Sequence, residues 1–295
     1  MPHKRESKMI AVSLNGSLYQ DEGDAAPRLS VTDRGFLLGD GLFETLPILG
    51  GHPLWWPEHL ARLRRAAKWI GLPLNEVLID EMLVQMCKES AGQNAILRFT
   101  ISRGSGGRGL LPPDMPKPTV LATLTPLPER LAFEEMSLVT STIRRNETSP
   151  TSQIKSLTYL DNILAARQAG QSKADDALML NTSGNVACST IGNLFALYDD
   201  LLVTPPCSDG CLPGILRQNL LTLAPEWGFR VKTASLTPQE LKKADGLIMT
   251  NSLRIIRRVS RLDSHPYDPS RNKAIGCLQQ RMRDEIEKQT RVSLT

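Results

Sequence analysis

The chain has 295 residues, of which 41% are hydrophobic and 22% charged, which is ordinary usage for a folded protein and argues against intrinsic disorder. Its formal charge of +4 comes from 35 basic and 31 acidic residues with no run of like charges, so composition does not predict a nucleic-acid partner. At this length two domains are expected.

The first half of the chain predicts strands and two helices. The amino terminus, MPHKRESKM, lacks the apolar stretch of a signal peptide. Residues 9–19 are apolar and β-favouring and are broken by Asn15-Gly16, a strong hairpin signal. Amphipathic helices are predicted over residues 58–70 and 75–91. Strands are predicted over residues 94–103 and 119–125, around a glycine- and proline-rich loop that we interpret as functional.

A change of pattern predicts where the first domain ends. The segment PLPERLA has two prolines and no clear period, so we expect a smaller domain over residues 1–128 and a larger one over residues 129–295. In the larger domain, the pattern of apolar residues predicts strands at 136–143, 176–181, 193–198, 229–235 and 246–250. It predicts helices at 158–169, 215–223 and 238–244. A charged helix from residue 272 follows. The expected fold is therefore a mixed α and β arrangement in two domains.

No segment reaches the roughly 18 to 20 consecutive apolar residues that cross a membrane, so the sequence predicts a cytoplasmic protein without a membrane partner. Its five cysteines are an odd number at irregular spacing, unlike a disulfide framework. Cys207 and Cys211 have three residues between them, but the four histidines show no partner spacing for zinc. We expect reduced thiols and no metal.

Three segments carry residues suited to chemistry. Lys155 stands just before a predicted helix, where its amine faces either a cleft or solvent; Schiff-base chemistry needs a lysine that is neutral. Pro213 and Gly214 precede an apolar helical run, which is either a plain turn or a phosphate site at a helix amino terminus. The strand LIMTNS ends in polar side chains, which form either a binding cluster or a simple turn.

Six motifs of this chain, taken in order, resemble the series of motifs found in class-IV aminotransferases. They are VTDRGFLLGDGLFET at 31–45, EHLARL at 58–63, IKSL at 154–157, GNLF at 192–195, PGILR at 213–217 and TNSLR at 250–254. The resemblance covers roughly residues 9–262 and implies a two-domain, fold-type IV enzyme that binds pyridoxal 5'-phosphate (PLP) in the cleft between its domains. It also implies a homodimer in which the partner chain completes the pocket for a small, amino-acid-like substrate.

The resemblance also assigns roles to individual residues. Lys155 is implied to hold PLP as a Schiff base and to act as general base, and Arg62 to contact the cofactor phosphate. The rest of the phosphate site is implied to be the backbone amides of Ile215 and Leu216 with Asn251 and Ser252. Tyr159 is implied to donate to the cofactor ring hydroxyl, and Phe36 to line the substrate pocket.

One position departs from the family pattern. A glutamate that pairs with the pyridine nitrogen usually precedes GNLF, and here the run is Val186-Ala187-Cys188. The change removes an acceptor that is ionised at neutral pH and supplies a thiol with an ordinary pKa of about 8.5. Three readings stay open: a thiolate at Cys188 replaces the carboxylate, the pyridine works unprotonated, or the protein binds cofactor without useful turnover.

The glycine-rich loop bears on the reaction. Its sequence RGSGGRGL, at residues 103–110, resembles the loop of aminodeoxychorismate lyases, and Arg108 matches an arginine that D-amino-acid aminotransferases use for the substrate carboxylate. We therefore expect a lyase that converts 4-amino-4-deoxychorismate to 4-aminobenzoate and pyruvate. The alternatives are an aminotransferase of D- or branched-chain amino acids and a PLP-binding protein with degenerate activity.

Overall fold

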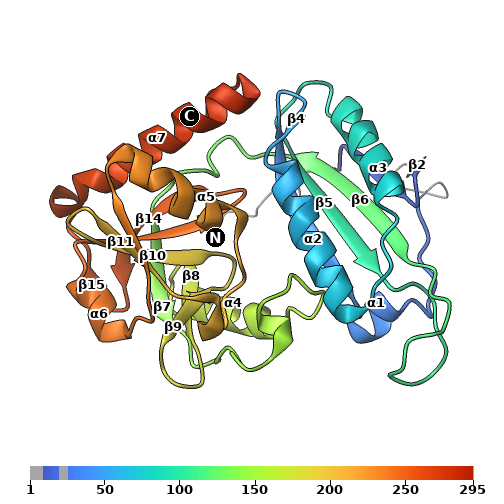
Figure 1. Cartoon of the computed structure of the whole chain (residues 1–295), viewed down its shortest axis with the longest axis horizontal. Helices are drawn as coiled ribbons and strands as arrows, with labels where there is room; N and C mark the ends of the chain where they lie inside the picture. Colours follow the sequence, from blue (N-terminus) through green and yellow to red (C-terminus); the bar gives the residue numbers. More distant parts are fainter. Residues whose placement is uncertain (1–8, 20–25, 295) are drawn as a thin grey trace. The chain divides into compact units, whose positions relative to one another are not determined.

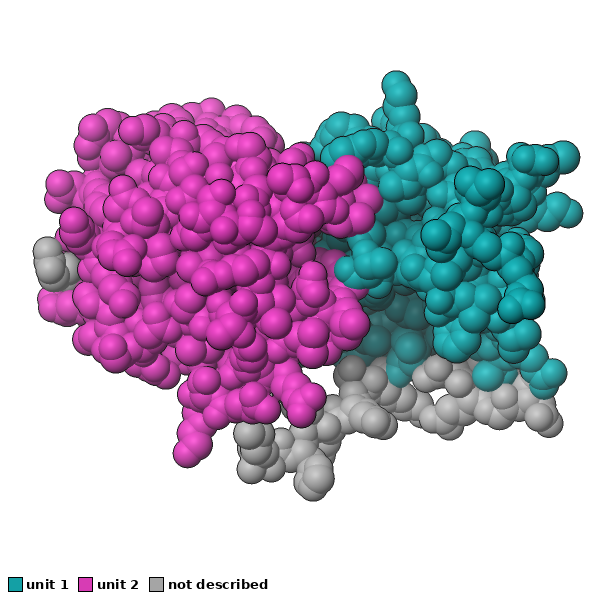
Figure 2. Space-filling model, turned by 90° about the horizontal axis from the view of Figure 1, so that it is seen from below, with its two compact units in different colours: residues 1–129, 155–158, 289–292 teal, residues 130–154, 159–288, 293–295 magenta. Residues whose placement is uncertain are grey.

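The computed structural model describes residues 9–19 and 26–294; residues 1–8, over which the sequence predicts no signal peptide, lie outside the described residues. The chain divides into two compact units, which Figure 2 colours separately. Unit 1 consists of Met1–Glu129, Lys155–Thr158 and Gln289–Val292, and unit 2 of Arg130–Ile154, Tyr159–Lys288 and Ser293–Thr295.

One segment lies in a different unit from the one expected. The sequence analysis assigned Lys155 to the domain at 129–295, whereas Lys155–Thr158 belong to unit 1. Backbone pairing is the reason: the Phe43 amide donates to the Lys155 carbonyl at 2.9 Å, and the Leu157 amide donates to the Gly41 carbonyl at 3.0 Å. The segment therefore extends the unit 1 sheet at one end of β3.

The described part of unit 1 forms a six-stranded antiparallel sheet in the order β2-β1-β6-β5-β3-β4. Helices α2 and α3 lie along this sheet in Figure 1, and their apolar stripes pack on it. The strands are β1 (Ala11–Leu14), β2 (Ser17–Tyr19), β3 (Gly41–Leu49), β4 (His52–Pro53), β5 (Ala95–Ser102) and β6 (Thr119–Pro126), and the helices are α1 (Arg34–Leu38), α2 (Trp56–Ile70) and α3 (Glu76–Glu89).

Strand β3 is central to unit 1 and is almost wholly buried. It pairs with β5 from Gly41↔Ser102 to Ile48↔Ala95, and all but one of its residues are buried. Gly41 is required at its start, because an added Cβ would lie 2.4 Å from the Ile101 carbonyl oxygen and 2.8 Å from a Leu157 methyl carbon. Close backbone approach at this glycine brings the Lys155 segment onto the strand.

The described part of unit 2 forms a mixed sheet in the order β12-β11-β10-β13-β14-β7-β8-β9, with β15 beside β14. Neighbours β11 and β12, β14 and β7, and β7 and β8 are parallel. The strands are β7 (Met136–Thr140), β8 (Asp176–Leu180), β9 (Val186–Ser189), β10 (Asn193–Tyr198), β11 (Leu201–Thr204), β12 (Arg230–Thr233), β13 (Gly246–Asn251), β14 (Ile255–Leu262) and β15 (His265–Pro266).

Helices complete unit 2. The α-helices are α4 (Leu160–Gln171), α5 (Ile215–Leu223), α6 (Pro238–Lys243) and α7 (Lys273–Thr290), and the short 3-10 helices are η2 (Pro150–Ser152), η3 (Cys207–Asp209), η4 (Ala224–Trp227) and η5 (Pro269–Asn272). The main core of the unit joins the sheet to α6 through residues such as Leu178, Leu194, Leu241 and Met249, all fully buried.

Candidate active site

Lys155 is held by backbone pairing on one side of β3. Beside the two hydrogen bonds already described, Ser156 forms an antiparallel bridge with Leu42. The lysine therefore does not sit on helix α4, which begins five residues later at Leu160. Its Nζ lies 4.2 Å from the centroid of the Phe43 ring, and the Arg98 guanidinium lies 3.9 Å from the centroid of the same ring.

The surroundings of the Lys155 amine favour its neutral form. Burial lowers its pKa most, the Arg62 charge lowers it further, Glu44 raises it and Arg98 lowers it, so that the pKa of Lys155 is about 7. The residue as a whole is only partly buried, but its amine lies against the buried Phe43 ring, so the desolvation of the charged end is substantial. A neutral amine at ordinary pH is the form that attacks a carbonyl.

A buried carboxylate organises the charges beside this lysine. Glu44, on β3, is 1% exposed and accepts from Arg62 Nε at 2.9 Å, from Arg62 Nη2 at 2.6 Å and from His59 Nδ1 at 2.7 Å. Arg62 and His59 lie one helical turn apart on α2, so both face the strand. Burial raises the pKa of the Glu44 carboxyl, but the Arg62 charge and the His59 hydrogen bond outweigh it and hold that pKa well below its usual range.

His59 takes part as a neutral donor. Burial lowers its pKa, and this outweighs the effect of Glu44, which raises it. Because an ionised carboxylate only accepts hydrogen bonds, the Nδ1 proton of His59 points at Glu44 Oε2. Glu44 thus fixes the imidazole orientation and the Arg62 guanidinium together.

In unit 2, the amino terminus of α5 has the geometry of an anion site. Gly214 caps the helix with extended backbone and no side-chain hydrogen bond, and the first amides, Ile215 and Leu216, have no acceptor within the helix. Asn193 Nδ2 donates to the Leu212 carbonyl at 2.8 Å. An added Cβ on Gly214 would lie 2.0 Å from Asn193 Oδ1, so glycine is required where this side chain packs on the helix start.

The end of β13 supplies the other candidate residues of the phosphate site. Asn251 Oδ1 accepts from the amides of Leu253 and Arg254, and its Nδ2 donates to the Ile191 carbonyl at 3.2 Å. Asn251 therefore shapes the turn that presents the partly exposed Ser252. One residue earlier, the Thr250 hydroxyl is buried without a hydrogen-bond partner among the described residues.

Cys188 lies on β9 in the core of unit 2. It is 7% exposed. Burial raises the pKa of its thiol to about 11, because the nearby Arg145 charge is too weak to compensate and Asp176 adds to the rise. Asp176 is itself buried and accepts from the Thr190 hydroxyl. These surroundings favour a neutral thiol, which argues against the thiolate reading of this position.

The glycine-rich loop is anchored through Arg34 on α1. Its guanidinium donates to Asp40 at 2.8 Å and to the carbonyls of Gly109, Leu110 and Leu111 at 3.1, 2.7 and 3.3 Å. Arg103, at the loop start, donates to the same Asp40 oxygen at 2.8 Å. Two buried arginines thus share one carboxylate and fix the loop backbone, while Arg108 is exposed.

The residues predicted from the sequence divide between the units. Lys155, Arg62, Phe36 and Arg108 lie in unit 1, and Phe36 is 76% exposed on α1. Unit 2 contains the remaining ones, which are Tyr159, Cys188, Ile215, Leu216, Asn251 and Ser252. Tyr159 is the residue just before α4 and is partly buried.

Sequence reasoning missed Glu44, His59, Arg34 and Asn193. A signal was present for Glu44, since a lone acid inside the apolar run GLFETLPIL is costly to bury without a cation. His59 and Asn193 stand within two of the quoted motifs, EHLARL and GNLF, without an obvious role until their contacts are known.

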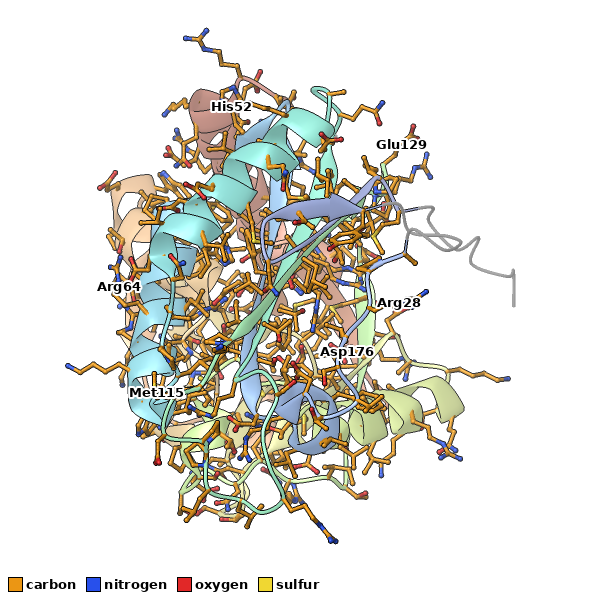
Figure 3. The ribbon with its side chains drawn as sticks, turned by 90° about the vertical axis from the view of Figure 1, so that its right-hand side faces the viewer. Arg28, His52, Arg64, Met115, Glu129 and Asp176 are labelled. Carbon is orange, nitrogen blue, oxygen red and sulfur yellow. The ribbon has the colours of Figure 1, made fainter. Side chains whose placement is uncertain are left out.

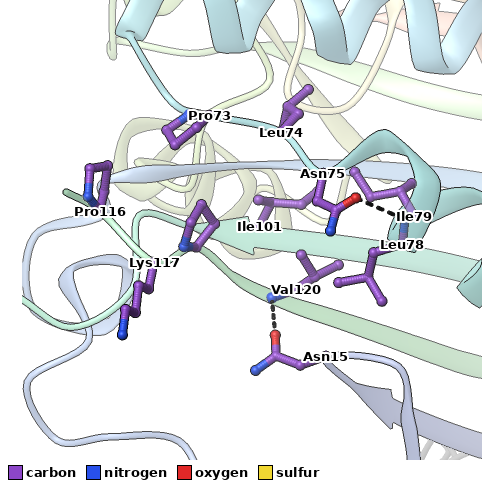
Figure 4. A pocket seen from close by; sticks show the side chains of 11 residues that line it. Asn15, Pro73, Leu74, Asn75, Leu78, Ile79, Ile101, Pro116, Lys117 and Val120 are labelled. Carbon is purple, nitrogen blue, oxygen red and sulfur yellow. Dashed lines mark hydrogen bonds between the residues drawn. The ribbon is translucent and has the colours of Figure 1, made fainter.

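A hollow of about 400 Å³ in unit 1 lies apart from Lys155. It lies between the Asn15 turn, the segment before α3 and residues Pro116–Pro118, which end the glycine-rich loop (Figure 4). Leu78 and Val120 are among the apolar side chains that line it. Its lining includes none of the candidate site residues. Over the described residues no group of three His, Cys, Asp or Glu side chains could hold a metal ion, and no helix is long and apolar enough to cross a membrane.

Comparison with known proteins places this geometry in context. A family model described as amino-transferase class IV matches residues 41–262. The aminodeoxychorismate lyase of Bacillus subtilis is 33% identical to this chain over 281 residues, an alignment that covers 94% of each of the two chains. The D-alanine aminotransferase of Staphylococcus epidermidis is 26% identical over 95% of this chain and 98% of its own.

The solved structures agree. The 4-amino-4-deoxychorismate lyase from Pseudomonas aeruginosa superposes with a TM-score of 0.80 at 28% identity, covering 94% of this chain and 99% of that one. The fold-type IV architecture expected from the motifs is confirmed.

Proposed function

We propose a lyase activity for this chain from one premise, that it belongs to the amino-transferase class IV family. It is a PLP-dependent enzyme of that family. The proposed reaction converts 4-amino-4-deoxychorismate to 4-aminobenzoate and pyruvate. Supporting it are the 33% identity to the lyase of Bacillus subtilis and the similarity to the Pseudomonas aeruginosa lyase structure.

The residues present fit PLP. When bound, this cofactor supplies an aldehyde that condenses with amines and a ring that withdraws electrons from the substrate. Lys155 provides an amine with a pKa of about 7, so a large share of it is neutral near pH 7. The α5 amino terminus provides unsatisfied amides for the phosphate. The buried Thr250 hydroxyl, which has no hydrogen-bond partner within the described part of the chain, lies at the end of the neighbouring strand.

In this proposal Lys155 binds the cofactor and then takes a proton from the substrate carbon that bears the amino group. Arg62 holds the phosphate, and Glu44 keeps the guanidinium in place through two hydrogen bonds. In unit 2, Ile215, Leu216 and Ser252 would bind phosphate, with Asn251 shaping the turn before Ser252. Tyr159 donates to the ring hydroxyl.

The observation that carries the choice of lyase is the anchored loop at 103–110. Its sequence resembles the lyase branch, and Arg34 fixes its last carbonyls on one side. We propose that Arg108 and Phe36 face the substrate from this part of unit 1, with Arg108 binding a carboxylate. Aminodeoxychorismate carries carboxylates, which suits an arginine with several donors.

Cys188 also favours elimination. A neutral thiol offers the pyridine nitrogen no negative charge, so the cofactor ring withdraws electrons more weakly than with a glutamate. Elimination of a good leaving group tolerates a weaker electron sink better than transamination does, since departure of the group removes the negative charge from the substrate carbon.

Transamination of D-amino acids is the second candidate, favoured by the D-alanine aminotransferase relatives. A coupled assay separates the two: aminodeoxychorismate is generated in situ and 4-aminobenzoate is measured, alongside D-alanine or a branched-chain amino acid with an oxo acid acceptor. Release of 4-aminobenzoate supports the lyase, and oxo acid exchange without it supports transamination. A cofactor spectrum that responds to none of these amines supports the degenerate protein.

We also propose a homodimer. In unit 1 the outward side chains include large apolar ones, with Phe36 76%, Leu110 82%, Leu111 88% and Met115 85% exposed; Figure 3 labels Met115. Large apolar side chains are seldom left this exposed together in a monomer, and association would cover them. Sedimentation equilibrium tests the proposal, with a monomer mass at micromolar concentration as the contrary result. A cytoplasmic location stays a prediction from the sequence.

A further inference from the structure

Two cysteines in the loop between β11 and α5 lie at either end of one short turn, outside the proposed catalytic machinery. Cys207 begins the short helix η3, and Gly210, with φ of +92°, ends it by donating its amide to the Cys207 carbonyl at 3.0 Å. Cys211 is the residue directly after this single tight turn. Cys207 packs against the buried cluster that contains Cys211, and the Cys211 thiol lies 4.0 and 3.7 Å from the carbonyl oxygens of Pro205 and Pro206.

The two thiols differ in exposure. Cys211 is 1% exposed and packs within a cluster of small residues that includes Ala165, Ala169 and Cys188. Cys207 packs against the same cluster from outside and is only partly buried. Solvent and small reagents therefore reach Cys207 first, while Cys211 stands behind it.

A buried cation lies beside the pair. Arg217, on the first turn of α5, is 6% exposed, and its Nη2 donates to the Pro205 carbonyl at 2.9 Å. Its Nε is buried without a hydrogen-bond partner among the described residues. Its charge acts on both thiols. An unsatisfied guanidinium group in a buried setting favours an anion nearby, and a thiolate at Cys207 is the candidate.

We propose that Cys207 and Cys211 form a redox-active dithiol that reacts with small disulfides. The Cys207 thiolate attacks one sulfur of the disulfide RSSR; a Cys207 S–S bond forms, the RS–SR bond breaks, and RS⁻ leaves with the electron pair and takes up a proton. Cys211 then loses its proton to solvent and attacks the Cys207 sulfur, releasing the second RS⁻. The two thiols are oxidised by two electrons and RSSR is reduced to two RSH.

The electrostatics agree with these roles. The hydrogen bond from Cys211 lowers the pKa of Cys207 most, burial raises it and Arg217 lowers it, so that it is about 6. The same hydrogen bond, with burial, raises the pKa of Cys211. Cys207 is therefore the nucleophile and Cys211 the resolving thiol.

Reactivity at low pH tests the assignment of the nucleophile. At pH 6.5 the full chain is treated with iodoacetamide, and alkylation is followed by peptide mass spectrometry. Cys207 is mostly thiolate at this pH, whereas an ordinary thiol is about 1% ionised; after allowing for weaker intrinsic nucleophilicity, Cys207 reacts about fivefold faster than the exposed Cys277. Alkylation of Cys207 that is slower than that of Cys277 overturns the assignment.

Oxidation tests the pair. With excess oxidised glutathione at pH 7.5, the wild-type chain loses alkylation at Cys207 and Cys211 together, with the mass of two hydrogens lost, while Cys277 stays alkylated. In Cys211→Ser, a glutathione adduct accumulates on Cys207; in Cys207→Ser, Cys211 stays reduced. Cys277→Ser is the matched control and behaves as wild type. A stable adduct on Cys207 of the wild-type chain, or oxidation mapped to Cys188 or Cys277, refutes the dithiol whatever reaction the enzyme catalyses.

Discussion

The buried carboxylate of Glu44 offers the sharpest prediction, because α2 contains a matched exposed ion pair. Glu44→Gln removes the charge that faces Arg62 and His59, while leaving one oxygen that still accepts a hydrogen bond. Two residues further along the same helix, Arg64 Nε and Nη2 donate to the Glu76 carboxylate at 2.8 and 2.5 Å. Glu76→Gln therefore makes the same chemical change in a pair of similar geometry.

The two pairs differ in burial, and this sets the expected magnitudes. The side chains of Arg62 and Glu44 are 7% and 1% exposed, and those of Arg64 and Glu76 are 56% and 35% exposed; Arg64 lies on the outer surface in Figure 3. Removing one partner of a buried ion pair lowers the free energy of unfolding by about 3–5 kcal/mol, because an uncompensated charge stays in the interior. Since glutamine still accepts one hydrogen bond, we expect Glu44→Gln to lower the free energy of unfolding by about 3 kcal/mol. In the exposed, solvent-screened pair, Glu76→Gln should lower it far less.

Urea denaturation of the cofactor-free protein at pH 7 measures both losses. Three of the four tryptophans, Trp55, Trp56 and Trp69, lie in unit 1, so fluorescence follows the unit that contains the change. The pKa of Glu44 is lowered by folding, so the stabilisation is fully present at pH 7 and is lost only as the pH falls through that low pKa. Equal free energies of unfolding for the two variants, within about 0.5 kcal/mol, would refute the reasoning.

Three further predictions concern the site itself. Because the pKa of Lys155 is lowered to about 7, the rate at which cofactor-free protein captures PLP rises with pH to about 7 and is level above it; a rate still rising beyond pH 9, followed by Schiff-base absorbance, contradicts this. Cys188→Glu raises D-alanine transamination about tenfold, or about 1.4 kcal/mol of barrier, whereas Cys188→Gln does not; an equal effect of both, measured as kcat/KM, counts against a role for the charge. Gly214→Ala weakens PLP binding about tenfold, or about 1.4 kcal/mol, because the added Cβ would lie 2.0 Å from Asn193 Oδ1. In the control Gly276→Ala the added Cβ has no neighbour within 4 Å, so the Kd for PLP is unchanged. Fluorescence titration with PLP measures both values.

Elements with local end signals were predicted well from the sequence. The Asn15-Gly16 turn has positive φ at both residues, as the hairpin between β1 and β2 requires. Helix α2 ends at Gly71 in the left-handed region, and the Asn75 side chain caps α3 by accepting from the Leu78 amide. These features depend on a few neighbouring residues, which is why a sequence reveals them.

Strands β3, β9, β11 and β14 were not predicted. In β3 all but one of the residues are buried, so the alternation of polar and apolar side chains that identifies a half-exposed strand is absent. Its pairing with β5 joins residues more than 45 positions apart, and no local pattern encodes such a contact.

The candidate site shows the same division. Lys155, Arg62 and the α5 amino terminus stand out through motif and spacing. Other features depend on how β3, α2 and the 155–158 segment pack in unit 1. They are the hydrogen bonds of Arg62 and His59 with Glu44, the pairing of the Lys155 segment with β3, and the lowered pKa of Lys155. The rise in the Cys188 pKa likewise depends on burial, which a sequence position does not reveal.

The attachment of PLP to Lys155 is tested most directly by borohydride reduction of the PLP-loaded protein followed by tryptic peptide mapping. Reduction fixes the cofactor on its lysine and blocks cleavage there, so the account predicts one modified peptide, residues 146–167, and none in Lys155→Arg. Modification of any other lysine, or an unmodified Lys155 in protein that retains PLP, would contradict the account.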